Sequence, residues 1–429
     1  MMGPVLYGAA ARLSGPVLRA HLRRRAKHGK EDPRRLTERF GCATVMRPDA
    51  PLVWFHAASV GESLSLLPLL NALTDREPAL HILVTTGTRS SADLLRERLP
   101  HQALHQYVPL DHPAWVARFL DHWRPEVALF VESELWPNLL RQTQRRGVPT
   151  GLLNARMSDR SFARWQRWPG LIRPLMGGLS LCLAQSPAQA ERMAALGAPD
   201  AWSPGNLKAA APPAQPDPAA RAHLAAAIGE RPHWLAASTH PGEEAITADA
   251  HAALVERVPN LLTLIVPRHP QRGEAIARKL RQRGINVARR SQNDKLTSET
   301  GIYLADSLGE LPLFYSLSDI AFIGGSLTLH GGHNPIEAAH YSCAILHGPD
   351  MANVADIATA LADEGAATTV TDAGDLANAV ETRLAEPGLC AQDGANAQAF
   401  AAAQTHVLPA VLDALAPLLA PLRATDAAA

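Results

Sequence analysis

The sequence predicts an α/β protein with two doubly wound parallel sheets in tandem. From about residue 50 onward, short apolar runs alternate with segments of helical periodicity, which is typical of βα units. The chain has 429 residues, more than one hydrophobic core usually supports. Its most proline-dense stretch, residues 204–218, separates two series of such units. We therefore expect two Rossmann-like domains joined by a linker, with a cleft between their carboxyl edges.

The predicted elements follow one another at short intervals. In the first series, strands are predicted at residues 52–55, 81–84, 127–131 and 150–153, and helices at 90–99, 114–123 and 137–146. The second series has predicted strands at 234–237, 262–266, 285–287 and 320–323. An alanine-rich helical stretch begins at residue 393.

The N-terminal segment is basic, although the whole chain is not. Lysine plus arginine equals aspartate plus glutamate, at 41 each, so the overall charge does not indicate nucleic-acid binding. Within residues 1–40 basic side chains predominate, and Leu6, Ala9, Leu13 and Val17 share one helical face. An apolar helix beside a basic cluster suits insertion into one leaflet of an anionic membrane, which we expect here. The alternative is a surface helix packed on the body of the protein.

These patterns divide the chain into four segments. Residues 1–40 form the membrane-associating N-terminal arm, 41–211 and 212–394 the two Rossmann-like domains, and 395–429 a C-terminal helix and tail. The four cysteines lie far apart with no C-x-x-C pair. This excludes a zinc knuckle and indicates a reducing, cytosolic setting.

The turn after the first predicted strand carries one carboxylate, Glu62. It lies at the carboxyl edge of the predicted sheet, where open α/β sheets bind ligands. Ser59 and Glu62 have the spacing of a capping box, in which the glutamate only closes the start of a helix. Backbone amides that hold this carboxylate would also lower its pKa and weaken it as a base. Capping and catalysis both stay open for Glu62 at this point.

A second pair of carboxylates follows the predicted strand at 127–131. Glu132 and Glu134 come at the ligand edge, where charged groups cost stability unless they are paired. Lys208, just before the linker, is a candidate cation near the cleft. The alternative is a surface lysine with a capping glutamate.

Four loops of the second domain follow predicted strands and carry polar or glycine-rich sequences, at residues 238–244, 267–270, 324–326 and 331–337. Glycine lets a backbone approach a phosphate closely, and Arg268 offers a planar donor fork for phosphate or carboxylate. Glu337 is placed to bind a ribose diol. Asn334, Pro335 and Glu337 also satisfy the rules for the start of a helix. Four such loops in one domain favour a nucleotide site.

The 18 histidines are scattered, without the spacing of a metal site. His56, His240, His269 and His333 each lie at a predicted strand end. We therefore expect no metal ion and expect these side chains to donate hydrogen bonds to substrate oxygens.

Together, these stretches resemble one family, the 3-deoxy-D-manno-octulosonic acid (Kdo) transferases of lipopolysaccharide synthesis. The matching stretches run in the family's order, and seven in register make the resemblance specific. They lie at residues 54–62, 132–138, 205–208, 238–243, 267–270, 308–311 and, as the seventh, 324–326 with 331–337. The resemblance implies an inverting GT-B glycosyltransferase. Such an enzyme moves Kdo from CMP-Kdo to a lipid A precursor, lipid IVA, and releases CMP.

The resemblance also implies roles for particular residues. The family's general base falls on Glu62, and its residues for transition-state stabilisation fall on Glu132 and Lys208, with Glu134 as the alternative to Glu132. Its CMP-Kdo contacts fall on Arg268, His269, Gly309, Glu310, Leu311, Asn334, Pro335, Ile336 and Glu337. The first domain would face the lipid acceptor and the second the donor. The family needs no metal ion or cofactor and works at the cytoplasmic face of the inner membrane.

Two other functions fit parts of the sequence. A soluble GT-B nucleotide-sugar epimerase would keep the architecture but would not need the basic apolar arm. A membrane-attached scaffold without activity would keep the fold, although the presence of Glu62, Arg268 and Glu337 argues against it.

Overall fold

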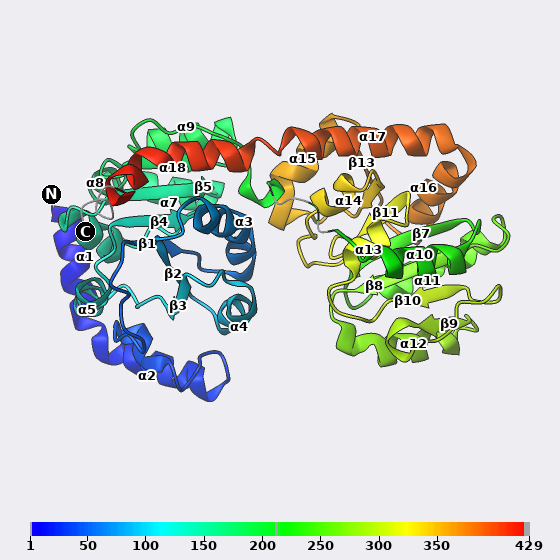
Figure 1. Cartoon of the computed structure of the whole chain (residues 1–429), viewed down its shortest axis with the longest axis horizontal. Coiled ribbons are helices and arrows are strands. Elements are labelled where there is room, and N and C mark those ends of the chain that lie inside the picture. Colours follow the sequence, from blue (N-terminus) through cyan, green and yellow to red (C-terminus); the bar gives the residue numbers. More distant parts are fainter. Residues whose placement is uncertain (1, 211–212, 214, 424–429) are drawn as a thin grey trace. The chain divides into compact units, whose positions relative to one another are not determined.

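The chain forms two α/β units, each around one parallel sheet. The computed structural model describes residues 2–210, 213 and 215–423. The first unit comprises Met1–Ala211 and Gln404–Ala429, and the second comprises Pro212–Ala403 (Figure 1). The division between them falls within the proline-rich stretch 204–218. The prediction of an α/β protein with two parallel sheets is confirmed.

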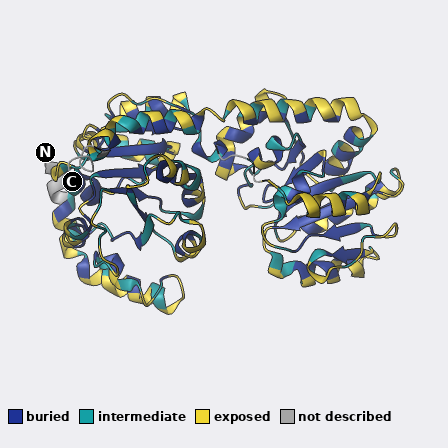
Figure 2. Cartoon of the chain, in the orientation of Figure 1, coloured by how far each residue is buried: buried dark blue, intermediate teal, exposed yellow. Residues whose placement is uncertain are grey.

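The sheet of the first unit has six parallel strands in the order β3-β2-β1-β4-β5-β6. Their bounds are β1 (Leu52–His56), β2 (His81–Thr86), β3 (Ala103–Tyr107), β4 (Val127–Val131), β5 (Thr150–Ala155) and β6 (Leu181–Ala184). Along β1, Leu52 and Trp54 pack in one core, while Val53 and Phe55 pack in another. Because cores cover both faces, the strand is buried throughout (Figure 2).

The helices of the first unit connect and flank these strands. They are α1 (Met2–Leu13), α2 (Gly15–Lys27), η1 (Leu36–Phe40), α3 (Val60–Arg76), α4 (Arg89–Arg98), α5 (Pro113–Trp123), α6 (Pro137–Arg145), α7 (Asp159–Gln166), α8 (Pro169–Met176), α9 (Pro187–Ala195), η2 (Leu207–Ala209) and α18 (Val407–Arg423). The carboxyl ends of all six strands meet at one edge of the sheet, since the strands are parallel. The loops that follow β1 and β4 are neighbours there, because these two strands pair.

The second unit has a seven-stranded sheet in the order β13-β12-β11-β7-β8-β10-β9. Its strands are β7 (His233–Thr239), β8 (Leu262–Pro267), β9 (Val287–Arg289), β10 (Ile302–Leu304), β11 (Ile320–Ile323), β12 (Ala344–His347) and β13 (Ala367–Thr369). Its helices are α10 (Pro218–Ile228), α11 (Glu243–Val255), η3 (Pro270–Arg272), α12 (Gly273–Gln282), η4 (Arg290–Gln292), α13 (Leu311–Tyr315), α14 (Ile336–His340), η5 (Ala352–Val354), α15 (Ala355–Asp363), α16 (Ala373–Ala385) and α17 (Pro387–Ala403).

The N-terminal arm packs on the first unit. Helix α1 contacts α5, α6 and α8. Gly8 is buried in this contact and faces the side chains of Asn138 and Arg141 on α6. The hydroxyl of Tyr7 donates a hydrogen bond to the buried carboxylate of Asp111. The predicted membrane-inserting N-terminal helix is therefore not supported, and α1 matches the alternative of a helix packed on the protein body.

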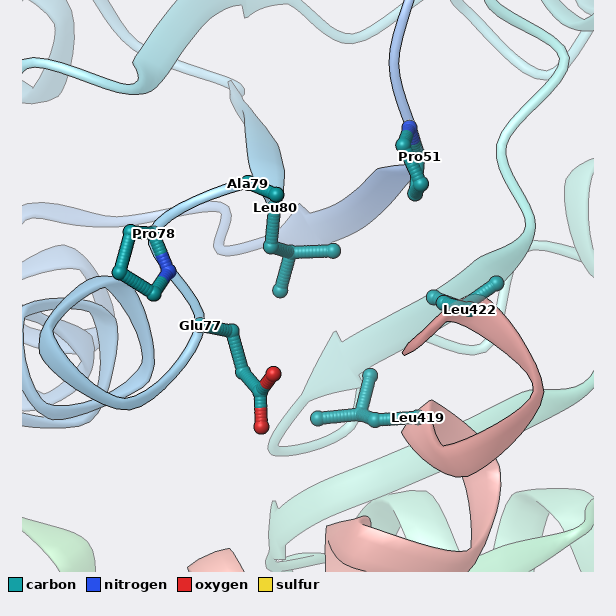
Figure 3. Close-up of a pocket in the computed structure, with 7 residues that line it drawn as sticks. All are labelled: Pro51, Glu77, Pro78, Ala79, Leu80, Leu419 and Leu422. Carbon is teal, nitrogen blue, oxygen red and sulfur yellow. The ribbon is translucent and has the colours of Figure 1, made fainter. Parts of the chain in front are cut away.

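Within the described residues, one helical stretch is apolar and long enough to cross a membrane by length and composition alone, Pro387–Leu422. It comprises α17 and α18, which belong to different units. Val411 and Leu415 of α18 are buried in a core of the first unit. Leu419, at the end of the same helix, lines a pocket with Leu80 (Figure 3). The apolar face of α18 thus belongs to a protein core.

The predicted boundary between residues 394 and 395 falls inside α17. Gly394, which marks it in the sequence, is a packing residue within this helix. A Cβ there would lie 2.1 Å from the carbonyl oxygen of Ser342, so the missing side chain lets α17 pack closely against its own unit.

Candidate active site

Glu62 lies in the first turn of α3, directly after β1. Ser59 Oγ accepts the Glu62 N–H at 3.3 Å and donates its own hydrogen to Glu62 Oε1 at 2.7 Å. The other carboxylate oxygen, Oε2, accepts the Ala58 N–H at 2.7 Å. This is a capping box in which the carboxylate is held at both oxygens. Only 8% of Glu62 is exposed.

The pKa of Glu62 is raised, chiefly because burial disfavours the charged carboxylate. The hydrogen bonds from Ser59 and Ala58 oppose this rise, whereas the negative charges of Glu132 and Glu134 add to it. The capping hydrogen bonds do lower the pKa of Glu62, as predicted, but the cost of burial exceeds their effect, so the net shift is upward. A raised pKa makes the carboxylate a stronger base, so capping and proton abstraction are compatible at Glu62.

Glu132 forms an ion pair with Lys208 next to the strand end. It follows β4 with a left-handed backbone, φ 55°. Its Oε1 lies 2.6 Å from Lys208 Nζ, and both side chains are mostly buried. Lys208 belongs to η2, whose start is fixed by Asn206 Oδ1 as it accepts the Lys208 N–H at 3.0 Å. The fold thus brings together two candidate residues that are far apart in the sequence.

Glu134 has different partners from Glu132. Its Oε2 lies 3.4 Å from His56 Nε2 and accepts the indole N–H of Trp136 at 2.6 Å. Burial alone would raise the pKa of Glu134, but the contacts with His56 and Trp136 hold it below its ordinary value. His56 Nδ1 lies 3.0 Å from the hydroxyl of Thr85. One ring nitrogen of His56 thus contacts Thr85 and the other lies near Glu134, so His56 is placed to position this carboxylate.

Arg268 and His269 follow β8 at the carboxyl edge of the second sheet. β8 lies between β7 and β10, and β11 lies on the other side of β7. The loops after these four strands contain all the candidate donor-binding residues. Arg268 N–H donates to the carbonyl of Thr239 at 3.0 Å, which joins the loops after β8 and β7. Burial, together with Arg268 and Arg272, lowers the pKa of His269.

Gly309, Glu310 and Leu311 form the turn between β10 and α13. Gly309 has φ 82°, a left-handed conformation that glycine adopts without strain. Glu310 binds the guanidinium of Arg290, with Nε to Oε2 at 2.9 Å, and this contact lowers its pKa. Leu311 begins α13. The carboxylate of Glu310 therefore carries an internal ion pair within its own unit.

Asn334, Pro335, Ile336 and Glu337 form the start of α14. Asn334 Oδ1 accepts the Ile336 N–H at 3.2 Å. The helix begins one residue later than the pattern predicts, because Pro335, and not Asn334, is at the N-cap. Pro335 and Ile336 are buried, whereas Glu337 is exposed. Glu337 thus lies at the surface of the loop edge.

Backbone N–H groups of the glycine-rich loop after β11 bind a carboxylate of the same unit. The N–H groups of Gly325, Ser326 and Leu327 donate to the carboxylate of Glu243 at 2.7, 3.0 and 3.0 Å. Glu243 is fully buried. The prediction that this backbone approaches a phosphate is therefore wrong for these amides, because an internal carboxylate already binds them.

Sequence reasoning missed two contributors to this edge. His330 packs against His240 with 4.1 Å between ring centroids. Arg272 makes a bidentate pair with Glu244, at 2.8 and 3.0 Å. The sequence could have revealed Arg272, because it lies one turn after Arg268 and directly before a helix. Nothing in its spacing marks His330, which lies in a loop.

In the described part of the chain, no group of three or more His, Cys, Asp or Glu side chains could hold a metal ion.

Solved structures with a similar fold define the fold class. A UDP-GlcNAc 2-epimerase from Neisseria meningitidis superposes with a TM-score of 0.57, at 13% identity, over 85% of this chain and 99% of that one. A glycosyltransferase from Rickettsia africae superposes with a TM-score of 0.56, at 12% identity, over 87% of this chain and 99% of that one. The fold is therefore GT-B-like.

Sequence comparisons identify the family. The family described as 3-deoxy-D-manno-octulosonic-acid transferase (kdotransferase) matches residues 34–211. A probable mitochondrial 3-deoxy-D-manno-octulosonic acid transferase from Arabidopsis thaliana is 38% identical over 89% of this chain and 88% of its own length. The 3-deoxy-D-manno-octulosonic acid transferase of Bordetella pertussis is 35% identical over 96% of this chain and 99% of its own length. The chain belongs to the 3-deoxy-D-manno-octulosonic acid transferase family.

Proposed function

We propose that this protein transfers Kdo from CMP-Kdo to a lipid A precursor, lipid IVA, with release of CMP and inversion at the anomeric carbon. Glu62 acts as the general base, and Glu132 with Lys208 stabilises the transition state. The first unit serves the lipid acceptor and the second serves the donor. Membership of the Kdo transferase family supports the reaction.

The observation that carries the proposed mechanism is the setting of Glu62. Each carboxylate oxygen accepts one hydrogen bond at 2.7 Å, which leaves each with a free lone pair. The raised pKa makes this fixed, buried carboxylate ready to take a proton. As the acceptor hydroxyl attacks the anomeric carbon, its proton passes to Glu62. The bond from that carbon to the phosphate oxygen breaks, and its electrons stay on CMP.

The donor side of the proposal rests on the loops of the second unit. Arg268 and His269 would bind the phosphate or carboxylate of CMP-Kdo, because a guanidinium fork matches either anion. The turns at Gly309, Glu310 and Leu311 and the start of α14 at 334–337 would bind the rest of the nucleotide. The proposed reaction requires residues of both units to act on one pair of substrates.

We further propose that the protein acts at the cytoplasmic face of the inner membrane, through its N-terminal helices. Leu13 and Val17 are 84% and 70% exposed, although both are apolar. Exposed Arg23, Arg24 and Lys27 follow on α2. An apolar patch beside basic residues favours an anionic lipid surface. The helices would then lie on the membrane without crossing it.

The other two functions are not favoured. The likeness to UDP-GlcNAc 2-epimerase is at 13% identity and concerns the fold alone. A scaffold without activity gives no reason for a buried base at Glu62 or for the ion pair of Glu132 with Lys208.

Incubation with a tetra-acylated lipid A precursor and a supply of CMP-Kdo tests the proposal. We expect the lipid mass to increase by one Kdo, or by successive Kdo increments, and the number of increments gives the number of sugars added. Release of free sugar with an unchanged lipid would point to the epimerase. An unchanged lipid and unchanged donor would contradict any catalytic function.

A further inference from the structure

Four imidazoles gather at the carboxyl edge of the second sheet, and they come from three loops. His240 follows β7, His269 follows β8, and His330 and His333 lie between β11 and α14. The ring of His240 stacks on that of His333 with 5.1 Å between centroids. It lies 4.1 Å from the ring of His330 and 5.8 Å from the ring of His269. His240 is thus the centre of the cluster.

A hydrogen bond joins His240 and His333 through their Nε2 atoms, which lie 2.9 Å apart. In an N–H···N bond, one nitrogen carries the hydrogen and the other presents its lone pair. The pair can therefore hold no extra proton or one extra proton. It cannot hold two, because two N–H groups would then point at each other. The geometry limits the pair to a charge of zero or one.

One buried carboxylate holds the two loops that carry this pair. Glu243 Oε2 accepts the N–H of His240 at 2.8 Å and the N–H of Gly325 at 2.7 Å. The backbone of Gly325 lies against both rings, since a Cβ there would be 3.3 Å from His333 and 3.4 Å from His240. The pair is therefore positioned before any ligand arrives.

Burial, together with the positive charges of Arg268 and Arg272, favours the neutral pair. Burial is the largest cause that lowers the pKa of His240 and of His333 to about 4, and the neighbouring positive groups add to it. The groups that act on the pair are Arg268, His269 and Arg272 after β8, His330 after β11, and Glu243, which accepts the His240 N–H. Glu244 binds Arg272, and Asp350, after β12, accepts the Gly331 N–H. A bound anion would offset the repulsion between a protonated pair and the nearby positive charges, and it would therefore favour protonation of the pair.

We propose that the His240–His333 pair takes up one proton from solvent when a nucleoside monophosphate or its sugar ester binds. The ring that already donates its Nε2–H becomes an imidazolium, and it keeps its hydrogen bond to Nε2 of the other ring. This inference rests on the proposed function, since it names a further part of the same donor site. Transfer converts a phosphodiester with one negative charge into a phosphomonoester, which carries nearly two charges above its second pKa of about 6. The proton on the pair offsets the added charge of the departing CMP.

Calorimetric titration of the full chain with CMP tests the proposal, in buffers that differ in ionisation enthalpy at about pH 7.5. At this pH free CMP holds almost no proton on its phosphate, so its own titration contributes little. We expect an uptake approaching one proton per CMP bound. The affinity should fall as the pH rises, at up to about tenfold per pH unit, which is the slope for one linked proton.

Replacement of one ring supplies the variant test. His333→Gln should reduce the proton uptake to near zero and weaken CMP binding, while His223→Gln, an exposed histidine on α10, should change neither. If His333→Gln fails to fold, the wild-type uptake and pH slope still decide the question. CMP binding without proton uptake would overturn this inference and leave the transfer reaction standing. Failure of the wild-type protein to bind CMP would instead contradict the proposed donor site.

Discussion

The properties of Glu62 are set by its local contacts. A glutamine at this position can accept the Ala58 N–H through its amide oxygen, so it can still close the helix start. It cannot accept a proton from a hydroxyl. We therefore expect Glu62→Gln to change the free energy of unfolding by no more than about 1 kcal/mol. The same variant should lower the rate of transfer by about 10²- to 10⁴-fold, the usual contribution of a general base.

Ser59→Ala is the matched control for Glu62→Gln. It removes the hydroxyl that binds Glu62 Oε1 but leaves the carboxylate in place. It should cost about 1 kcal/mol of stability and reduce the rate far less. The rate of the wild-type protein should rise with pH through the raised pKa of Glu62, because the base must be ionised. Near wild-type turnover by Glu62→Gln would show that Glu62 is only a helix cap.

The two carboxylates after β4 can be distinguished by their partners. Glu132 binds Lys208 at 2.6 Å, whereas Glu134 contacts His56 and Trp136. If the ion pair stabilises the transition state, Glu132→Gln should lower kcat by at least about tenfold with a smaller change in KM.

The comparison variant is Glu134→Gln, which leaves the ion pair with Lys208 intact. We expect it to reduce kcat less than Glu132→Gln, and steady-state kinetics on the two proteins decide between them. A larger loss of kcat in Glu134→Gln would instead assign the stabilisation of the transition state to Glu134.

At the scale of elements, α1 is attached to the first unit through a buried carboxyl group. Asp111 accepts the N–H groups of Asn138 and Leu139 at 3.0 and 2.8 Å, and it also accepts the hydroxyl of Tyr7 from α1. Burial nevertheless raises its pKa from 3.8 to about 6. The folded protein thus binds this proton more tightly than the unfolded chain does. Its contribution to stability is complete below about pH 4 and is lost as the pH rises through about 6.

Asp111→Asn removes this titration and should flatten the pH dependence of stability. Relative to the variant, the wild-type protein should lose roughly 2 kcal/mol between pH 4 and 7, which is most of the free-energy equivalent of the raised pKa. Tryptophan fluorescence during denaturant unfolding reports mainly on this unit, because all the tryptophans except Trp234 precede residue 212. Asp121→Asn on the exposed side of α5 is the control. If the free energy of unfolding has the same pH dependence in wild type and Asp111→Asn, Asp111 is not the group responsible for this loss of stability.

Apolar patterns predicted the strands well, because strands covered on both faces consist of continuous apolar runs. The run at 52–55 became β1 and the run at 262–266 lies within β8, whereas the predicted strand at 285–287 is shifted to Val287–Arg289. Strands β3 and β13 have no such run, since β3 contains His105 and Gln106 and β13 is the short segment Ala-Thr-Thr. β3 and β13 lie at sheet edges and are only partly buried, so their sequences resemble those of loops. Strands β6, β10 and β12 are largely buried and were also not predicted, because their apolar runs are short.

Across the whole molecule, most partners of the candidate residues could not be predicted, although Lys208 was a candidate partner for the carboxylates after β4. Local rules described the capping box at Glu62 and the helix start near Asn334, because those contacts span only a few residues. The ion pair of Glu132 with Lys208 and the contact of Glu243 with the loop at 325–327 join distant segments. Such contacts depend on strand order, which no local pattern contains. The packing of α18 on the first unit is also a contact between distant segments, and it could not be predicted either.

The distribution of charge over the whole molecule makes one further prediction, because a neutral chain with a basic N-terminal arm should bind anionic membranes through that arm alone. Arg23 and Arg24 are exposed on α2, and each basic residue near an anionic surface contributes about 1 kcal/mol. Replacement of both by glutamine should weaken binding to phosphatidylglycerol vesicles by roughly 2 kcal/mol, or about thirtyfold. Replacement of the exposed Arg278 and Lys279 on α12 is the charge-matched control and should have little effect. Sedimentation with vesicles at low and high salt measures both. Equal weakening by the two replacements, or binding that is insensitive to salt, would show that the arm is not the membrane-binding surface.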